Sequence, residues 1–202
     1  NKVLYDFFQT GTYDRNREFV LTTSPSMDIL ISSNLERLIY KISGEDARKD
    51  TDLMAELKTK GSYAITGEMK ANLADFAAGY ATEEQVAKTI HDVYEDTGYV
   101  MDTHTAVAAT VYKAYREDSK DDRKTVIAST ASPYKFAGSV MTAIDPKYKG
   151  QDDFKLIEEL QKVSGTEIPN AIKEIMNAEI RHSTECDVDQ MEQTVKNILG
   201  VK

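Results

Sequence analysis

Three hydroxyl side chains follow a short β-branched run in the second half of the chain. The run Thr125–Ala128 leads into Ser129, Thr130 and Ser132, and Pro133 opens the next segment. In an α/β protein, ligands bind at the carboxyl ends of buried strands, where such hydroxyls offer neutral hydrogen bonds. The alternative is that they cap the helix opened by Pro133, because Ser and Thr are common N-cap residues.

Two stretches further upstream also combine an extended segment, a polar turn and a helix start. In residues 99–108, Asp102, His104 and Thr105 stand where a strand is expected to pass into a helix. Asp102 is a natural N-cap and is interpreted as structural. Residues 22–38 place hydroxyl, amide and guanidinium groups around the start of another predicted helix.

Across these three blocks the sequence resembles threonine synthase, a pyridoxal-phosphate enzyme of fold type II. The family patterns are roughly SPSMDILxSSNxERL, DPHTAVA and STAxPxKF. This chain has SPSMDILISSNLERL, DTHTAVA and STASPYKF in the same order. The resemblance is strong from Asn1 to about Phe136 and weaker in the tail. Thr103 replaces the usual proline, which changes the stiffness of the turn more than its chemistry.

The resemblance implies roles for particular side chains. Thr130, with Ser129 as the alternate, would contact the pyridine nitrogen of the cofactor. A neutral hydroxyl there does not hold the ring protonated as a carboxylate would, so the ring withdraws electrons less strongly. The residues assigned to the substrate are Ser26, Asn34, Arg37, His104, Thr105 and Lys135. Arg37 suits a phosphate because its guanidinium matches two phosphate oxygens. Pairing of Arg37 with a carboxylate, and a local ordering role for His104, remain open alternatives.

The implied reaction converts O-phosphohomoserine and water to threonine and phosphate. The Schiff-base lysine and the phosphate cradle are expected upstream of Asn1, and Lys135 does not occupy the Schiff-base segment. The chain is therefore expected to be a C-terminal portion that is inactive alone, does not retain the cofactor and works with the missing N-terminal part. Two alternatives are another fold-type-II pyridoxal-phosphate lyase or dehydratase, and a non-enzymatic helical interaction module with an acidic surface.

The spacing of apolar residues predicts the elements that position these groups. Helices are expected over residues 2–10, 33–42, 82–97 and 105–116, with capping boxes starting at Ser33 and Thr82. Residues 45–61 suggest a surface helix or a mobile excursion. A strand or an extended connector is expected over residues 29–31, and strands are expected over residues 76–80, 99–101 and 126–128.

The strand–helix alternation indicates an α/β fold, with a partial parallel sheet flanked by helices and belonging to a larger sheet. Residues 1–145 are expected to form the C-terminal part of a large cofactor-binding domain. Residues 146–202 are expected to form a helical extension that packs on it.

Composition limits the partners. The 202 residues carry a net charge of −9, which argues against nucleic acid and against anionic membranes, since both are bound through basic groups. One cysteine and three histidines argue against a Cys/His zinc site, and the single cysteine fits a reducing cytoplasm, which is the expected location. The sequence contains no apolar run of about 18 residues, which is the length that a membrane-spanning helix needs, so no membrane span is predicted.

Overall fold

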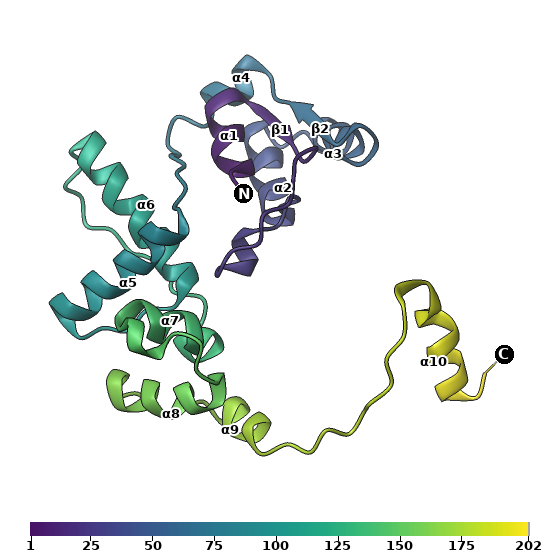
Figure 1. Ribbon diagram of the computed structural model, residues 1–202. Helices are drawn as coiled ribbons and strands as arrows, with labels where there is room; N and C mark the ends of the chain where they lie inside the picture. The colour runs from purple at the N-terminus through teal and green to yellow at the C-terminus, as the bar shows by residue number, and fades with distance from the viewer. Residues whose placement is uncertain (202) are drawn as a thin grey trace. The chain divides into compact units, whose positions relative to one another are not determined.

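The computed structural model describes residues 1–201 and is rich in helices (Figure 1). The chain divides into two compact units, residues 1–168 and a second unit that begins at Pro169. The predicted domain boundary after residue 145 stays a prediction. No helix within residues 1–201 is long and apolar enough to cross a membrane.

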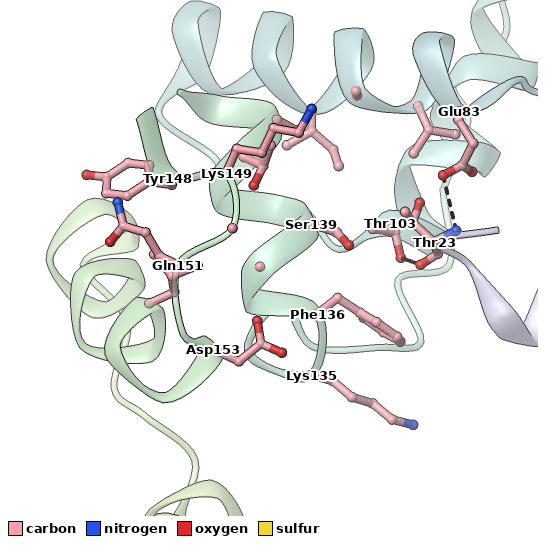
Figure 2. A pocket seen from close by; sticks show the side chains of 18 of the residues that line it. Thr23, Glu83, Thr103, Lys135, Phe136, Ser139, Tyr148, Lys149, Gln151 and Asp153 are labelled. Atoms are coloured by element: carbon pink, nitrogen blue, oxygen red, sulfur yellow. Dashed lines mark hydrogen bonds between the residues drawn. The ribbon is translucent and has the colours of Figure 1, made fainter. Parts of the chain in front are cut away.

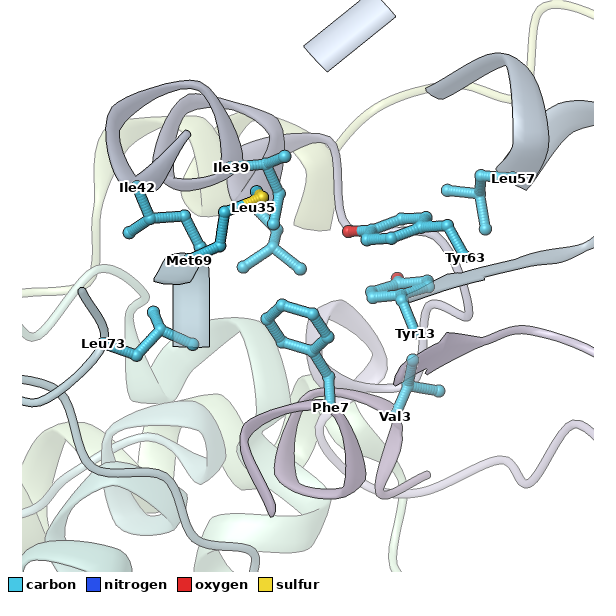
Figure 3. Packing of buried hydrophobic residues seen from close by; sticks show 10 residues of the cluster. All are labelled: Val3, Phe7, Tyr13, Leu35, Ile39, Ile42, Leu57, Tyr63, Met69 and Leu73. Atoms are coloured by element: carbon cyan, nitrogen blue, oxygen red, sulfur yellow. The ribbon is translucent and has the colours of Figure 1, made fainter. Parts of the chain in front are cut away.

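The first unit begins with a small α/β assembly. Its elements are α1 (Val3–Thr10), β1 (Thr12–Asp14), the 3₁₀ turn η1 (Pro25–Met27), α2 (Ser33–Ile42), α3 (Ala47–Lys60), β2 (Ser62–Ala64) and α4 (Gly67–Ala71). Figure 3 shows the cluster of apolar side chains that these elements enclose. Phe7 and Ile39 are fully buried in it, and each such side chain contributes about 1.5–3 kcal/mol through burial.

Two tyrosines join the strands to this core. Tyr13 and Tyr63 are register partners in the antiparallel pair, and their rings stack with centroids 5.4 Å apart. Burial, followed by the nearby Tyr13 and Asp50, raises the pKa of Tyr63 well above its ordinary value. Burial also raises the pKa of Tyr13, although the N–H of Ser32, bonded to its hydroxyl, opposes the shift.

Four further helices form the rest of the first unit. They are α5 (Glu83–Thr97), α6 (Thr103–Ser119), α7 (Ala137–Ile144) and α8 (Asp153–Ser164), joined in part by the 3₁₀ turns η2 (Pro133–Phe136) and η3 (Pro146–Tyr148). Helix α5 packs against α6 and α7, and α7 packs against α8. The buried side chains of α6 come from its first turn, residues 103–106.

The predicted parallel sheet is absent from residues 1–201, whose strands are the antiparallel pair β1–β2. Residues 29–31, 76–80, 99–101 and 126–128 form no strand. Val126 is 93% exposed. Branched side chains favour an extended backbone, but a strand also requires a hydrogen-bonded neighbour, which is a non-local condition.

One of the two predicted capping boxes is present in the structure and the other is not. The capping box of α5 is confirmed: Thr82 Oγ1 accepts from the N–H of Gln85, whose side-chain oxygen accepts from the N–H of Thr82. The capping box at Ser33 is wrong, because Ser32 is the N-cap of α2 and makes no side-chain capping bond. The N–H of Ser32 instead donates to the Tyr13 hydroxyl at 2.8 Å, so a contact with β1 sets where α2 begins.

The second unit contains α9 (Asn170–Met176), the 3₁₀ turn η4 (Val188–Gln190) and α10 (Met191–Leu199). With α8, these elements confirm that the described chain after Asp152 is helical and contains no strand. The apolar side chains of α10 are exposed; Ile198 and Leu199 each keep 68% of their surface accessible.

Candidate functional site

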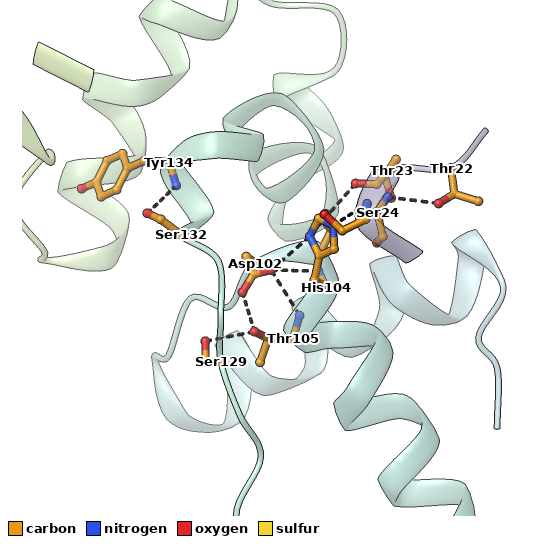
Figure 4. A network of polar contacts seen from close by, with 11 residues as sticks. Thr22, Thr23, Ser24, Asp102, His104, Thr105, Ser129, Ser132 and Tyr134 are labelled. Atoms are coloured by element: carbon orange, nitrogen blue, oxygen red, sulfur yellow. Dashed lines mark hydrogen bonds and ion pairs between the residues drawn. The ribbon is translucent and has the colours of Figure 1, made fainter. Parts of the chain in front are cut away.

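A buried carboxylate organises the start of α6 (Figure 4). Asp102 is 1% exposed, and its Oδ1 accepts the backbone N–H groups of His104 and Thr105 at 2.8 and 3.2 Å. Its Oδ2 accepts the Thr105 hydroxyl. These bonds confirm Asp102 as the N-cap of α6, and they occupy both carboxylate oxygens.

His104 connects this helix start to the turn at η1. Its Nε2 accepts the backbone N–H of Ser26 at 3.1 Å, so the neutral ring carries its proton on Nδ1. Nδ1 lies 3.4 Å from the hydroxyl of Thr103, which donates to the carbonyl of Thr23 at 2.9 Å. Both ring nitrogens of His104 therefore make local contacts, which fits the alternative that His104 orders this turn. A contact between His104 and the substrate stays a prediction.

The hydroxyl-rich segment, residues 129–132, contacts the start of α6 through one side chain. Ser129 Oγ lies 2.9 Å from Thr105 Oγ1, and both hydroxyl-bearing residues Ser129 and Thr130 are exposed. Within residues 1–201 the Thr130 hydroxyl makes no hydrogen bond. Ser132 caps η2 by accepting the N–H of Tyr134 at 3.3 Å, so the capping alternative holds for Ser132 and not for Ser129.

Two predicted substrate residues line one small cavity. Ser26 and Asn34 contribute to a cavity of about 240 Å³ between the start of α1, η1 and the start of α2. Ser24 also lines it; this residue is 1% exposed, and its hydroxyl has no partner within the described residues. Arg37 is exposed and donates to Asn34 Oδ1 at 3.1 Å, and no carboxylate of residues 1–201 pairs with it.

Lys135 faces a different cavity (Figure 2). This space of about 830 Å³ lies among α5, α7, η3 and the start of α8. It brings Lys135 together with Thr103 and Glu83, and Glu83 accepts the N–H of Thr23 at 3.1 Å. The Lys135 ammonium lies 5.9 Å from the centre of the Phe136 ring. Lys135 does not line the cavity that holds Ser26 and Asn34, although the two cavities adjoin, because Glu83 and Val86 line both.

Sequence reasoning missed three polar residues of this region. Ser24, Asp28 and Thr103 are each 1–2% exposed, and Asp28 accepts both the N–H and the hydroxyl of Thr22. The Thr103 hydroxyl bonds a carbonyl 80 residues away in the chain, a contact that no local pattern indicates. The groups of potential metal ligands that a metal centre needs are absent from residues 1–201.

Comparison with known proteins identifies the relatives of this chain. Residues 105–198 match the family model for the C-terminal region of threonine synthase. Threonine synthase of Saccharomyces cerevisiae is 35% identical over 183 residues, which cover 81% of this chain and 35% of that protein.

Two solved structures have the same fold. Threonine synthase from yeast aligns with a TM-score of 0.73 and 26% identity over 98% of this chain and 40% of that one. PLP-bound threonine synthase from Brucella melitensis aligns with a TM-score of 0.69 and 27% identity over 96% of this chain and 38% of that one. The fold is therefore that of part of a pyridoxal-phosphate enzyme.

These matches confirm the resemblance in the three sequence blocks: the chain is similar to a C-terminal portion of threonine synthase. The family model extends through the helical tail to residue 198. The chain spans between 20% and 36% of the length of the curated relatives compared with it.

Proposed function

We propose that this chain supplies the C-terminal portion of a pyridoxal-phosphate-dependent threonine synthase, which converts O-phosphohomoserine and water to threonine and phosphate. The observation that carries the proposal is the alignment of nearly the whole chain with two threonine synthase structures. The match of residues 105–198 to the family's C-terminal region supports it independently.

The hydroxyls of Ser129 and Thr130 fit the pyridine end of the cofactor. Both residues are exposed, and Ser129 is held by Thr105, so hydroxyl oxygens are available to a ring nitrogen that takes one hydrogen bond. When bound, pyridoxal phosphate supplies the electron sink for proton removal next to an amino group. This chain's contribution is to bind and orient the ring nitrogen.

The substrate phosphate is proposed to bind beside the 240 Å³ cavity. Ser26 and Asn34 offer neutral donors there, and Arg37 lies beside Asn34 with no competing carboxylate among residues 1–201. The first turn of α2, which lacks a side-chain cap, leaves backbone N–H groups for an anion. Arg37 would hold the phosphate as it leaves, because charge-assisted bonds strengthen as negative charge develops.

Three further residues complete the proposed substrate set. His104 and Thr105 hold the turn that carries Ser26 and the segment that carries Ser129. Lys135 is exposed at the larger cavity, where it offers a second cation to an anionic substrate.

The lysine that holds the cofactor is proposed to lie outside these 202 residues, so the chain alone is expected to be inactive and not to retain the cofactor. Residues 1–145 would complete the cofactor-binding domain, and residues 146–202 would form its helical extension. The missing part of the protein is then the chain's main partner, and the assembly is expected in the cytoplasm.

The test uses the full-length protein that contains this chain, incubated with pyridoxal phosphate and O-phosphohomoserine. Phosphate and threonine are expected to appear in equal amounts, and the 202-residue chain alone is expected to yield neither. Thr130→Ala in the full-length protein should weaken catalysis while leaving the thermal unfolding midpoint nearly unchanged; an unchanged rate of phosphate release would remove the role assigned to Thr130.

The same assay separates the competing functions. Cofactor binding without phosphate release, together with release of a keto acid from serine or threonine, would indicate a dehydratase. Absence of cofactor binding by the full-length protein would overturn the enzymatic proposal and favour the interaction module.

A further inference from the structure

Two hydrogen bonds join the start of α6 to the turn η1, across 78 and 80 residues of the chain. The backbone N–H of Ser26 donates to His104 Nε2 at 3.1 Å, and the Thr103 hydroxyl donates to the carbonyl of Thr23 at 2.9 Å. Figure 4 shows the His104 ring beside Thr23. No side chain of η1 is buried, so these bonds to α6 hold the turn more than its own packing does.

Only an unprotonated His104 can make the bond to Ser26. The neutral imidazole accepts at one nitrogen and donates at the other, whereas the charged ring donates at both. With Nε2 accepting, the proton of the ring lies on Nδ1, 3.4 Å from the Thr103 hydroxyl oxygen. A second proton on Nε2 would point at the N–H of Ser26, so protonation of His104 breaks the bond that holds η1.

Burial leaves water little access to this ring. His104 is 6% exposed, and its ring packs against Phe136 with centroids 4.8 Å apart. Its Nδ1 lies 3.5 Å from Asp102 Oδ1. The elements packed around His104 carry further charged groups, which are Asp28 after η1, Glu83 on α5 and Lys135 on η2. Because these groups lie around a shielded ring, water does not readily replace Nε2 as the acceptor for Ser26.

We propose that His104 is a positioning residue that holds η1 in its unprotonated form, so that the anionic substrate binds more weakly when His104 is protonated. The inference rests on the proposed function. Ser26 lines the cavity assigned to the substrate, and the N–H of the same residue is bonded to His104, so release of η1 moves a wall of that cavity. Histidine changes its charge between about pH 5 and 8, so the weakening belongs to mildly acidic solution.

Two variants of His104 separate the acceptor from the proton. His104→Gln keeps an acceptor, the amide oxygen, which does not take up a proton in this pH range. His104→Leu removes the acceptor altogether. The control is His91→Gln, because His91 is exposed on α5 and its Nδ1 faces Asp92 at 3.7 Å.

The experiment uses the full-length protein that contains this chain, loaded with pyridoxal phosphate, and measures KM and kcat for O-phosphohomoserine from pH 5.5 to 8. At pH 8, His104→Leu should raise KM about tenfold, the effect of losing one hydrogen bond, with little change in kcat. Because a phosphate ester itself titrates near pH 6, the pH effect is the ratio of the wild-type KM to that of His104→Gln. This ratio should rise as the pH falls, whereas the ratio of the wild type to His91→Gln should stay constant.

Hydrogen exchange of residues 22–28, followed by mass spectrometry of the same full-length proteins, tests the contact without activity. These residues should exchange faster in His104→Leu than in the wild type and His104→Gln.

An unchanged KM in His104→Leu, or a fall in kcat alone, would overturn the inference and leave the proposed function intact. A KM ratio of the wild type to His104→Gln that does not change with pH would also overturn it. If His104→Leu does not fold, His104→Gln and its pH profile still decide the question. Absence of phosphate release by the wild type would overturn the proposed function, and hydrogen exchange would then show whether His104 holds η1.

Discussion

Replacing Asp102 by Ala is expected to destabilise the chain far more than the loss of an ordinary helix cap. Two backbone N–H groups lose their acceptor, which costs about 1–2 kcal/mol. The buried Thr105 hydroxyl also loses its acceptor, which adds about 1–3 kcal/mol. Because the two contributions share one cavity and partly overlap, we expect a total of about 2–4 kcal/mol.

The matched control is Asp46→Ala. Asp46 caps α3 in the same way, accepting the N–H groups of Arg48 and Lys49 at 3.0 Å each, but this residue is exposed. Water can replace its carboxylate, so its removal is expected to cost less than removal of Asp102. The two variants lose the same kind of cap and differ in burial.

Urea unfolding of the 202-residue chain, followed by circular dichroism, measures both free energies by linear extrapolation. The loss in Asp102→Ala should exceed that in Asp46→Ala by about 1–3 kcal/mol. Equal losses would show that water reaches the start of α6 in the folded chain, and the argument from burial at Thr105 would be wrong.

Three other predictions concern the core of the first unit. Burial raises the pKa of Tyr63 above its ordinary value of 10.0. Because the unfolded chain then loses the Tyr63 hydroxyl proton at a lower pH than the folded chain, the free energy of unfolding should fall as the pH rises above 10. Tyr63→Phe should reduce that fall when it is compared with the wild type in urea titrations from pH 8 to 11. Gly61→Ala should cost more than Gly44→Ala in the same assay: both positions have positive φ, but a Cβ at Gly61 would clash with the side chain of Asn16, whereas a Cβ at Gly44 would meet no atom. Equal costs would show that only backbone strain contributes. Ile39→Ala, at a fully buried position, should lower the free energy of unfolding by about 2–5 kcal/mol, and a loss below 1 kcal/mol would contradict the packing of α2.

Local sequence signals predicted most of the longer helices and several of their ends, but not α4. Thr82 and Gln85 form the predicted capping box, and Gly98 ends α5 in the left-handed conformation. Asp102 caps α6 as expected. Each of these features depends on groups within about four residues of one another, which is the range over which spacing is informative.

The strands were predicted poorly for the opposite reason. Residues 126–128 have strand-forming side chains but no hydrogen-bonded neighbour, whereas β1 and β2 pair across about 50 residues without a strong local signal. Strand pairing depends on contacts between distant segments. The β propensity of a residue shows only how well its side chain suits a sheet surface, and it does not show which strand lies beside it.

The sequence by itself established the resemblance to threonine synthase, because three blocks of specific residues occur in family order, and it determined the residue types available at the site. Only the tertiary structure decided which of them meet. It joined His104 to Ser26 and Ser129 to Thr105, and it placed Lys135 in the cavity that adjoins that of Ser26 and Asn34. Side-chain chemistry is a local property of the chain, whereas hydrogen-bond direction and burial arise from packing between segments that lie far apart in sequence.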